Sequence, residues 1–128
     1  MIKTGIDIVK ISKVAELIKK DPNFTSKILT DAEVLYCESK KVNGNLDKEY
    51  QTFAGLYATK EAVLKALGVG ITKLTYFKQI EVAHNEFNKP YLNTFGEVSK
   101  IFCTLDITEN DISISHDGEY AIAICVLK

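Results

Sequence analysis

Hydrophobic and polar residues alternate along Lys3–Val9, near the start of the sequence. An alternation of period two is typical of a β-strand, because successive side chains point to opposite faces. Ile6 and Ile8 would lie on one face and Asp7 on the other. Aspartate is uncommon in strands, so Asp7 is a candidate functional residue. The alternative is a structural aspartate whose carboxylate accepts hydrogen bonds from nearby N–H groups.

Apolar residues recur with a helical period in several later stretches. Thr30 and Glu33 have the spacing of a capping box, in which each side chain accepts a backbone N–H, so a helix is expected to begin there. The longest stretch ends at Gly68, and glycine commonly follows the last turn of a helix. The predicted helices are Ile11–Lys20, a short one through Tyr36 and Cys37, about Tyr50 to Leu67, and 96–105.

Runs rich in β-branched and aromatic residues fill much of the second half of the chain. The pair Asp117-Gly118 is a strong hairpin signal and joins the last two runs. The final run is apolar on both faces, as expected of a strand in the centre of a sheet. The predicted strands are 78–84, 90–95, 111–116 and 119–127, with a loop at 40–49 and a hairpin turn at 85–89.

The composition is that of a globular protein, with 128 residues of which 46% are hydrophobic and 26% charged. This length predicts one domain, 1–128. The net charge of −1 gives no basic field for nucleic acid. No apolar run reaches the length of a membrane span, and no signal-peptide core is present at the N-terminus, so no membrane contact is expected. The three cysteines suit no disulfide framework, which favours the cytoplasm.

The longest predicted helix carries charged residues on or beside its apolar side. Lys60 falls within the apolar stripe, where a charge is costly to bury without a partner. Glu61 falls at the edge of the stripe with Lys65 one turn later, among alanines that leave space for a ligand. An exposed Glu–Lys pair at this spacing often has no function. The other interpretation is a bound phosphate with its cation. All 16 basic residues are lysine, so ammonium groups would bind that phosphate.

His116 ends a predicted strand beside the hairpin turn, in "SISHDG". A lone histidine at such a place is more often a solvated loop residue than part of a site. Ser115 and His116 point in opposite directions as strand neighbours, so they do not form a nucleophile pair by themselves. The residues alone therefore predict no more than an acidic metal site next to a phosphate-binding helix.

The segments "GIDIV", "TDAEVLYC", "FAGLYATKEAVLKALGVGI", "NKPYL" and "ISISHDGEYAIAICVL" occur in the order seen in one enzyme family. The chain resembles the holo-acyl-carrier-protein synthases, the short 4′-phosphopantetheinyl transferases, over nearly its whole length. The resemblance implies a single-domain α+β fold, with a mainly antiparallel sheet packed against a long helix. It also implies a homotrimer with active sites at the subunit interfaces. The implied reaction moves phosphopantetheine from coenzyme A to a serine of apo-acyl carrier protein, with Mg²⁺, in support of fatty acid biosynthesis.

The resemblance also assigns roles to residues. Asp7 and Glu61 match the metal ligands, and together with Lys65 they are the implied catalytic residues. The implied contacts to coenzyme A are Lys60, Lys65, Gly68, Gly70 and His116. Lys13 stands where the family usually has a carrier-docking arginine, and Lys10 is expected beside it in docking. The serine proton would be removed by Glu61, Asp7 or a metal-bound water, and the sequence does not choose among them.

The chain departs from the family where the carrier protein and the rim of the coenzyme site would be contacted. Leu56 replaces an arginine, Thr59 an alanine and Asp117 a threonine. The metal and transfer residues are retained. The leading interpretation is therefore an enzyme, and the alternative is a non-catalytic module of the same fold that binds a nucleotide or a carrier protein.

Overall fold

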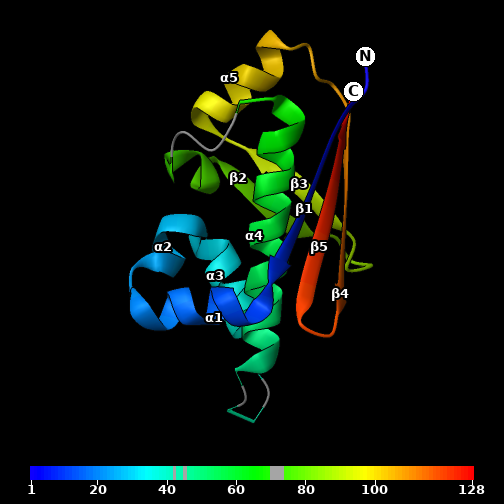
Figure 1. Cartoon of the computed structure of the whole chain (residues 1–128). Coiled ribbons are helices and arrows are strands. Elements are labelled where there is room, and N and C mark those ends of the chain that lie inside the picture. Colours follow the sequence, from blue (N-terminus) through cyan, green and yellow to red (C-terminus); the bar gives the residue numbers. More distant parts are fainter. Residues whose placement is uncertain (42, 45, 70–73) are drawn as a thin grey trace.

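The computed structural model of the chain describes residues 1–41, 43–44, 46–69 and 74–128. One long helix, α4 (Asp47–Leu67), runs through the middle of the molecule with the other elements around it (Figure 1). It begins a few residues before the predicted start, with Asp47 and Glu49 in its first turn, where carboxylates favour the helix dipole. It ends as predicted at Gly68, whose φ of 74° is left-handed.

A three-stranded antiparallel sheet packs against α4 in the strand order β1-β5-β4. The strands are β1 (Lys3–Lys10), β4 (Asn110–Asp117) and β5 (Tyr120–Leu127). The predicted central position of the last strand is therefore confirmed, as is the tight hairpin at Gly118. Close approach to α4 requires Gly5, because a Cβ there would lie 1.8 Å from the carbonyl oxygen of Ala62.

The other face of this sheet carries a group of exposed isoleucines. They are Ile6, Ile8, Ile122 and Ile124, which are 37–61% exposed. We call these four residues the outer isoleucine face. Side chains of this kind normally lie in a core, so a contiguous group of them at a surface indicates an interaction site.

A second, two-stranded sheet pairs β2 (Ile80–His84) with β3 (Pro90–Thr94), and α5 (Gly96–Thr104) follows it. The sequence predicted that the first of these strands begins at Lys78, which was wrong by two residues. Lys78 and Gln79 instead belong to a 3₁₀ helix, η1 (Leu74–Gln79), whose Tyr76 and Phe77 are buried.

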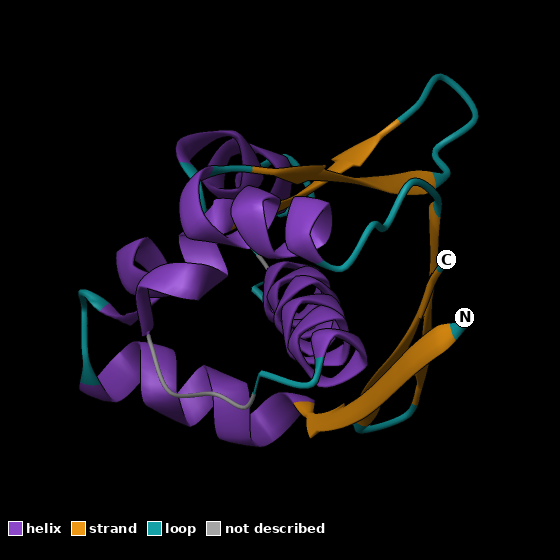
Figure 2. Cartoon of the chain, turned by 90° about the horizontal axis from the view of Figure 1, so that it is seen from above, coloured by secondary structure: helices purple, strands orange, loops and turns teal. Residues whose placement is uncertain are grey.

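Three short helices cover the side of α4 opposite the three-stranded sheet (Figures 1 and 2). They are α1 (Ile11–Lys20), α2 (Phe24–Ile28), which the sequence analysis missed, and α3 (Asp31–Glu38). The predicted capping box is present at the start of α3: Thr30 N donates to Glu33 Oε1 at 2.9 Å, and Glu33 N donates to Thr30 Oγ1 at 3.3 Å. Within the described ranges, no helix is long and apolar enough to cross a membrane.

Candidate active site

Asp7 lies on the face of β1 that packs against α4, and it is 9% exposed. The Nζ of Lys65, on α4, donates to Asp7 Oδ1 at 3.0 Å and to the carbonyl oxygen of Ile6 at 3.0 Å. The Lys65 side chain is 53% exposed, so its ammonium remains accessible to a ligand. The structure thus brings together two of the predicted catalytic residues from segments that are far apart in the sequence.

Glu61 lies one turn before Lys65 on α4, with its carboxyl group beside that of Asp7. Burial raises the pKa of Glu61 to about 7, and the neighbouring Asp7 carboxyl adds to this rise, while Tyr57 and Lys65 oppose it. Two adjacent carboxylates repel each other unless a proton or a cation lies between them. In the protein without a cation, Glu61 therefore keeps its proton up to a pH of about 7.

The cluster fits a hard divalent cation. Asp7 Oδ2 is buried and has no hydrogen-bond partner apart from a proton on the neighbouring Glu61 carboxyl. A cation would take the place of that proton and complete the environment of the oxygen. No group of three or more His, Cys, Asp or Glu side chains suited to a metal occurs in the parts of the chain that are described. Mg²⁺ commonly binds one or two carboxylates and takes its other ligands from water and substrate phosphates. Asp7 and Glu61 match that pattern.

Tyr57 also belongs to this cluster, and it was not among the residues that the sequence singled out. Its hydroxyl forms a hydrogen bond with Glu61, and burial raises the pKa of the hydroxyl, so it stays protonated. Its ring lies against that of Phe77, with ring centroids 5.6 Å apart. The i, i+4 spacing from Tyr57 to Glu61 was the available signal, because such residues share one side of a helix.

A groove of about 510 Å³ leads along α1 to Glu61. Lys10 and Lys13, the expected docking residues, line the same groove as Glu61. Its apolar lining consists of Ile8, Val9, Val14, Leu17, Tyr57 and Tyr120. The groove therefore offers ammonium groups and an apolar surface beside the carboxylate cluster.

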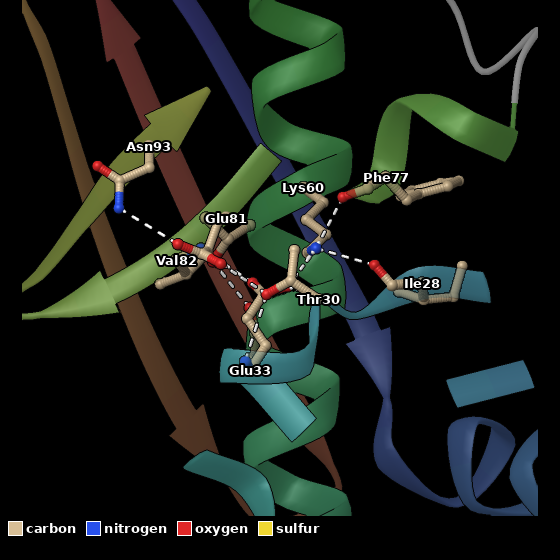
Figure 3. A network of polar contacts seen from close by, with 10 residues as sticks. Ile28, Thr30, Glu33, Lys60, Phe77, Glu81, Val82 and Asn93 are labelled. Atoms are coloured by element: carbon tan, nitrogen blue, oxygen red, sulfur yellow. Dashed lines mark hydrogen bonds and ion pairs between the residues drawn. The ribbon is translucent and has the colours of Figure 1, made fainter. Parts of the chain in front are cut away.

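Lys60 does not belong to this cluster, contrary to the expectation that it contacts coenzyme A. Its side chain is fully buried on another side of α4, and its Nζ forms an ion pair of 2.6 Å with Glu33 Oε1 (Figure 3). A charge in an apolar stripe requires a partner, and here that partner is the capping-box glutamate. In this structure the Lys60 ammonium therefore has no surface from which to contact a coenzyme.

His116 also lies apart from the cluster. It is the penultimate residue of β4, and its Nε2 is 3.1 Å from the carbonyl oxygen of Gln51. It abuts Gly55, where a Cβ would approach its ring within 2.9 Å. Asp7 lies on β1, and β5 separates the two strands, which places them about 10 Å apart. Gly55 precedes Glu61 by about 9 Å along the axis of α4. One chain therefore does not bring His116 to the carboxylates.

A small pocket of about 180 Å³ opens beside His116. Leu56, which replaces a family arginine, is 2% exposed and contributes an apolar wall to it. The hydroxyl of Thr59, another departure, donates to the carbonyl oxygen of Gly55 at 2.8 Å inside the core. Of the two glycines expected at the coenzyme site, Gly68 forms the end of α4, and Gly70 lies outside the described residues.

Residues 3–125 match the sequence profile of the 4′-phosphopantetheinyl transferase superfamily. The chain is 40% identical over 126 residues to a holo-[acyl-carrier-protein] synthase of Finegoldia magna, and this alignment covers 98% of this chain and 95% of the relative. It is 39% identical over 124 residues to a synthase of the same name from Clostridium botulinum, covering 97% and 94% of the two chains.

Solved structures of such synthases have the same fold. The structure of the Helicobacter pylori synthase in complex with coenzyme A superposes on this chain with a TM-score of 0.81. The two sequences are 32% identical, and the match covers 98% of this chain and 99% of the other. The structure from Neisseria meningitidis gives a TM-score of 0.84 at 29% identity, covering 100% and 99% of the two chains. The α+β fold expected from the sequence is thereby confirmed.

Proposed function

The chain belongs to the 4′-phosphopantetheinyl transferase superfamily, and on this premise we propose that Asp7, Glu61 and Lys65 form its active centre. Its activity is that of a holo-[acyl-carrier-protein] synthase. It transfers the 4′-phosphopantetheine group from coenzyme A to a serine of apo-acyl carrier protein and releases adenosine 3′,5′-bisphosphate. The observation that carries the assignment of the centre is the convergence of two carboxyl groups and an exposed ammonium at one point between β1 and α4.

The proposed mechanism begins with the pyrophosphate of coenzyme A between Lys65 and the two carboxylates. Mg²⁺ held by Asp7 and Glu61 would neutralise the pyrophosphate and act as a Lewis acid on it. Lys65 holds Asp7 through one hydrogen of its ammonium and has the exposure to contact the phosphates. Its charge stabilises the negative charge that develops as the serine Oγ forms a bond to the β-phosphorus and the bond to the departing bisphosphate breaks.

Glu61 is the proposed acceptor of the serine proton. The sequence left this role open among Glu61, Asp7 and a metal-bound water. Asp7 Oδ1 already accepts a hydrogen bond from Lys65, whereas Glu61 lines the groove through which the serine would arrive. Tyr57 orients the Glu61 carboxyl group through its hydrogen bond. Its position in the lining of the groove therefore favours Glu61 over Asp7.

A complete site is proposed to form between copies of the chain, in a homotrimer. Two observations support this. His116 and Asp7 lie on the two edge strands of one sheet, so the neighbouring chain of a trimer could bring its own His116 to the carboxylates of this chain. The outer isoleucine face offers the apolar surface that a stable subunit interface needs.

Subunit complementation tests the assembly. Asp7→Ala chains and His116→Ala chains are each expected to be inactive or strongly impaired alone. After mixing with exchange of subunits, some sites would combine an intact Asp7 with an intact His116, and activity should reappear. Mixtures as inactive as their components, or a monomer mass for the wild-type protein in light scattering, would contradict the proposal.

The carrier protein is proposed to dock on α1 and the groove that contains Lys10 and Lys13. Acyl carrier proteins are acidic, and the α1 surface around the exposed Leu17 carries Lys13, Lys19 and Lys20, together with one carboxylate, Glu16. Holo-carrier protein supports fatty acid biosynthesis, which is the proposed cellular role. A cytoplasmic location is proposed because Cys37, Cys103 and Cys125 are all free.

The proposed function is tested by the release of adenosine 3′,5′-bisphosphate, followed by chromatography. Release should require coenzyme A, Mg²⁺ and apo-carrier protein together, and it should stop when the acceptor serine of the carrier is replaced by alanine. Binding of coenzyme A without release, with several apo-carriers, would instead favour the non-catalytic module.

A further inference from the structure

Lys60 is a buried lysine next to Glu61 in sequence that the proposed mechanism does not use. It is 0% exposed. Its Nζ donates to the carbonyl oxygens of Ile28 at 2.8 Å and Phe77 at 2.7 Å, and to Glu33 Oε1 at 2.6 Å (Figure 3). Three acceptors use all three hydrogens of an ammonium group, and a neutral amine has only two. Lys60 is therefore charged, although burial acts to lower its pKa.

The carboxylate of Glu33 accepts two further hydrogen bonds. Besides Lys60, its Oε1 accepts Thr30 N at 2.9 Å and its Oε2 accepts Val82 N at 2.9 Å. The Thr30 hydroxyl donates to Glu81 Oε2 at 2.7 Å, and Glu81 Oε1 accepts from Asn93 Nδ2 at 3.3 Å. Through this network, the Lys60 ammonium connects α4 with α2, α3, η1 and the two-stranded sheet.

These bonds hold α4 on the side away from the catalytic cluster. On its other side, the close contact of Gly5 with Ala62 fixes the distance between β1 and α4. Such a contact limits approach but restrains rotation of the helix about its axis only weakly. Lys60 adds to the restraint that core packing gives, because its directional bonds to three separate elements are satisfied over a narrow range of rotations. A side-chain atom about 6 Å from a helix axis moves by about 1 Å when the helix turns by about 10°.

We propose that Lys60 is a positioning residue for the transfer reaction. Its buried ammonium fixes the rotation of α4, and thereby directs Glu61 and Lys65 at Asp7. Displacements of about 1 Å can reduce a catalytic rate by about 10²-fold, so loss of this restraint acts on turnover. The inference rests on the proposed function of Asp7, Glu61 and Lys65.

The test compares Lys60→Met with Val98→Ala. Methionine keeps much of the length of the lysine but has no ammonium, and Val98 is a fully buried residue of α5 outside the network. Circular dichroism identifies a temperature at which both variants are folded. There we expect kcat of Lys60→Met to fall at least tenfold, and its Mg²⁺ affinity in the presence of coenzyme A to fall at least threefold. The Val98→Ala control should stay within twofold of wild type in both.

Glu33→Gln provides a second variant if Lys60→Met does not fold. It preserves the shape of the side chain and removes the charge that pairs with Lys60, so a smaller loss of kcat in the same direction is expected. A folded variant with the kcat and Mg²⁺ affinity of the control would overturn the inference. A large rise in the KM for coenzyme A at unchanged kcat would also overturn it and would indicate direct contact with the coenzyme. An inactive wild-type enzyme would contradict the proposed function, while the Mg²⁺ titrations would still test Lys60.

Discussion

Substitution of Gly5 by alanine tests whether the close contact between β1 and α4 sets the geometry of the active centre. A Cβ at this position would lie 1.8 Å from the Ala62 carbonyl oxygen, 2.8 Å from its carbonyl carbon and 2.8 Å from Ala66 N. All three atoms are helix backbone, so no side-chain rotation relieves the clash. The strand and the helix must separate by about 1.6 Å before the shortest contact reaches 3.4 Å, where ordinary van der Waals contact begins.

The separation affects both stability and activity. Overpacking of a core typically costs about 1–3 kcal/mol, and a clash with backbone falls at the upper end, about 3 kcal/mol. For a domain of this size, that loss lowers Tm by about 12 °C. Because Asp7 lies on the strand and Glu61 and Lys65 on the helix, the same shift opens the carboxylate cluster. A displacement above about 1 Å reduces kcat by about 10²-fold.

The assay measures Tm by calorimetry and kcat at a temperature at which the variant is folded. Gly44→Ala is the control, because its φ of 76° imposes backbone strain, while no atom of the described residues beyond its chain neighbours lies within 4 Å of its added Cβ. The control should lose about 1 kcal/mol and keep its kcat. The reasoning is refuted if Gly5→Ala retains wild-type kcat, or if its Tm falls no further than that of Gly44→Ala.

Three further predictions concern charge. Folding raises the pKa of Glu61 from its ordinary 4.5 to about 7, so metal-free protein should lose stability as the pH rises from about 4.5 to 7. Tm measured across this range in EDTA checks this, and Asp7→Asn should reduce the dependence of Tm on pH. Lys65→Ala should lose much more kcat than Lys65→Arg, since charge is the proposed contribution of Lys65, and equal rates in steady-state kinetics would refute it. Lys13→Glu should raise the KM for the acidic carrier protein and leave the KM for coenzyme A unchanged. The measurement is made at low salt, because ion pairs at a surface are weak and salt screens them; an unchanged KM for the carrier would place docking elsewhere.

Features that depend on neighbouring residues could be predicted from the sequence. The capping box of Thr30 and Glu33 spans three residues and has a pattern of its own. Gly68 ends α4 because glycine adopts the left-handed conformation that a helix end needs. The alternation of Lys3–Val9 placed Asp7 on the face opposite the isoleucines, as the structure has it. Asp7 also lies beside Glu61 and Lys65, while the roles that the family resemblance gives these three residues stay predictions.

Features that depend on packing between distant segments could not be predicted in this way. The sequence showed Lys60 as a charge in an apolar stripe, but its partner Glu33 lies 27 residues away. The capping box already accounted for Glu33, so nothing in the sequence linked it to Lys60. Lys78 and Gln79, the first two residues of the predicted strand 78–84, belong to the 3₁₀ helix η1, because burial of Tyr76 and Phe77 overrides the local preference for a strand. His116 and Asp7 were grouped by family role, while the strand order places them at opposite edges of the sheet.

The most direct test of the central claim is the intact mass of an apo-acyl carrier protein after incubation with this protein, coenzyme A and Mg²⁺. We expect the wild-type protein to add the mass of one phosphopantetheine group to the carrier. Asp7→Ala and Glu61→Ala should add none in the same time, while circular dichroism shows both variants folded. An unmodified carrier with the wild-type protein would contradict the transferase assignment, and modification by Glu61→Ala at the wild-type rate would contradict the proposed active centre.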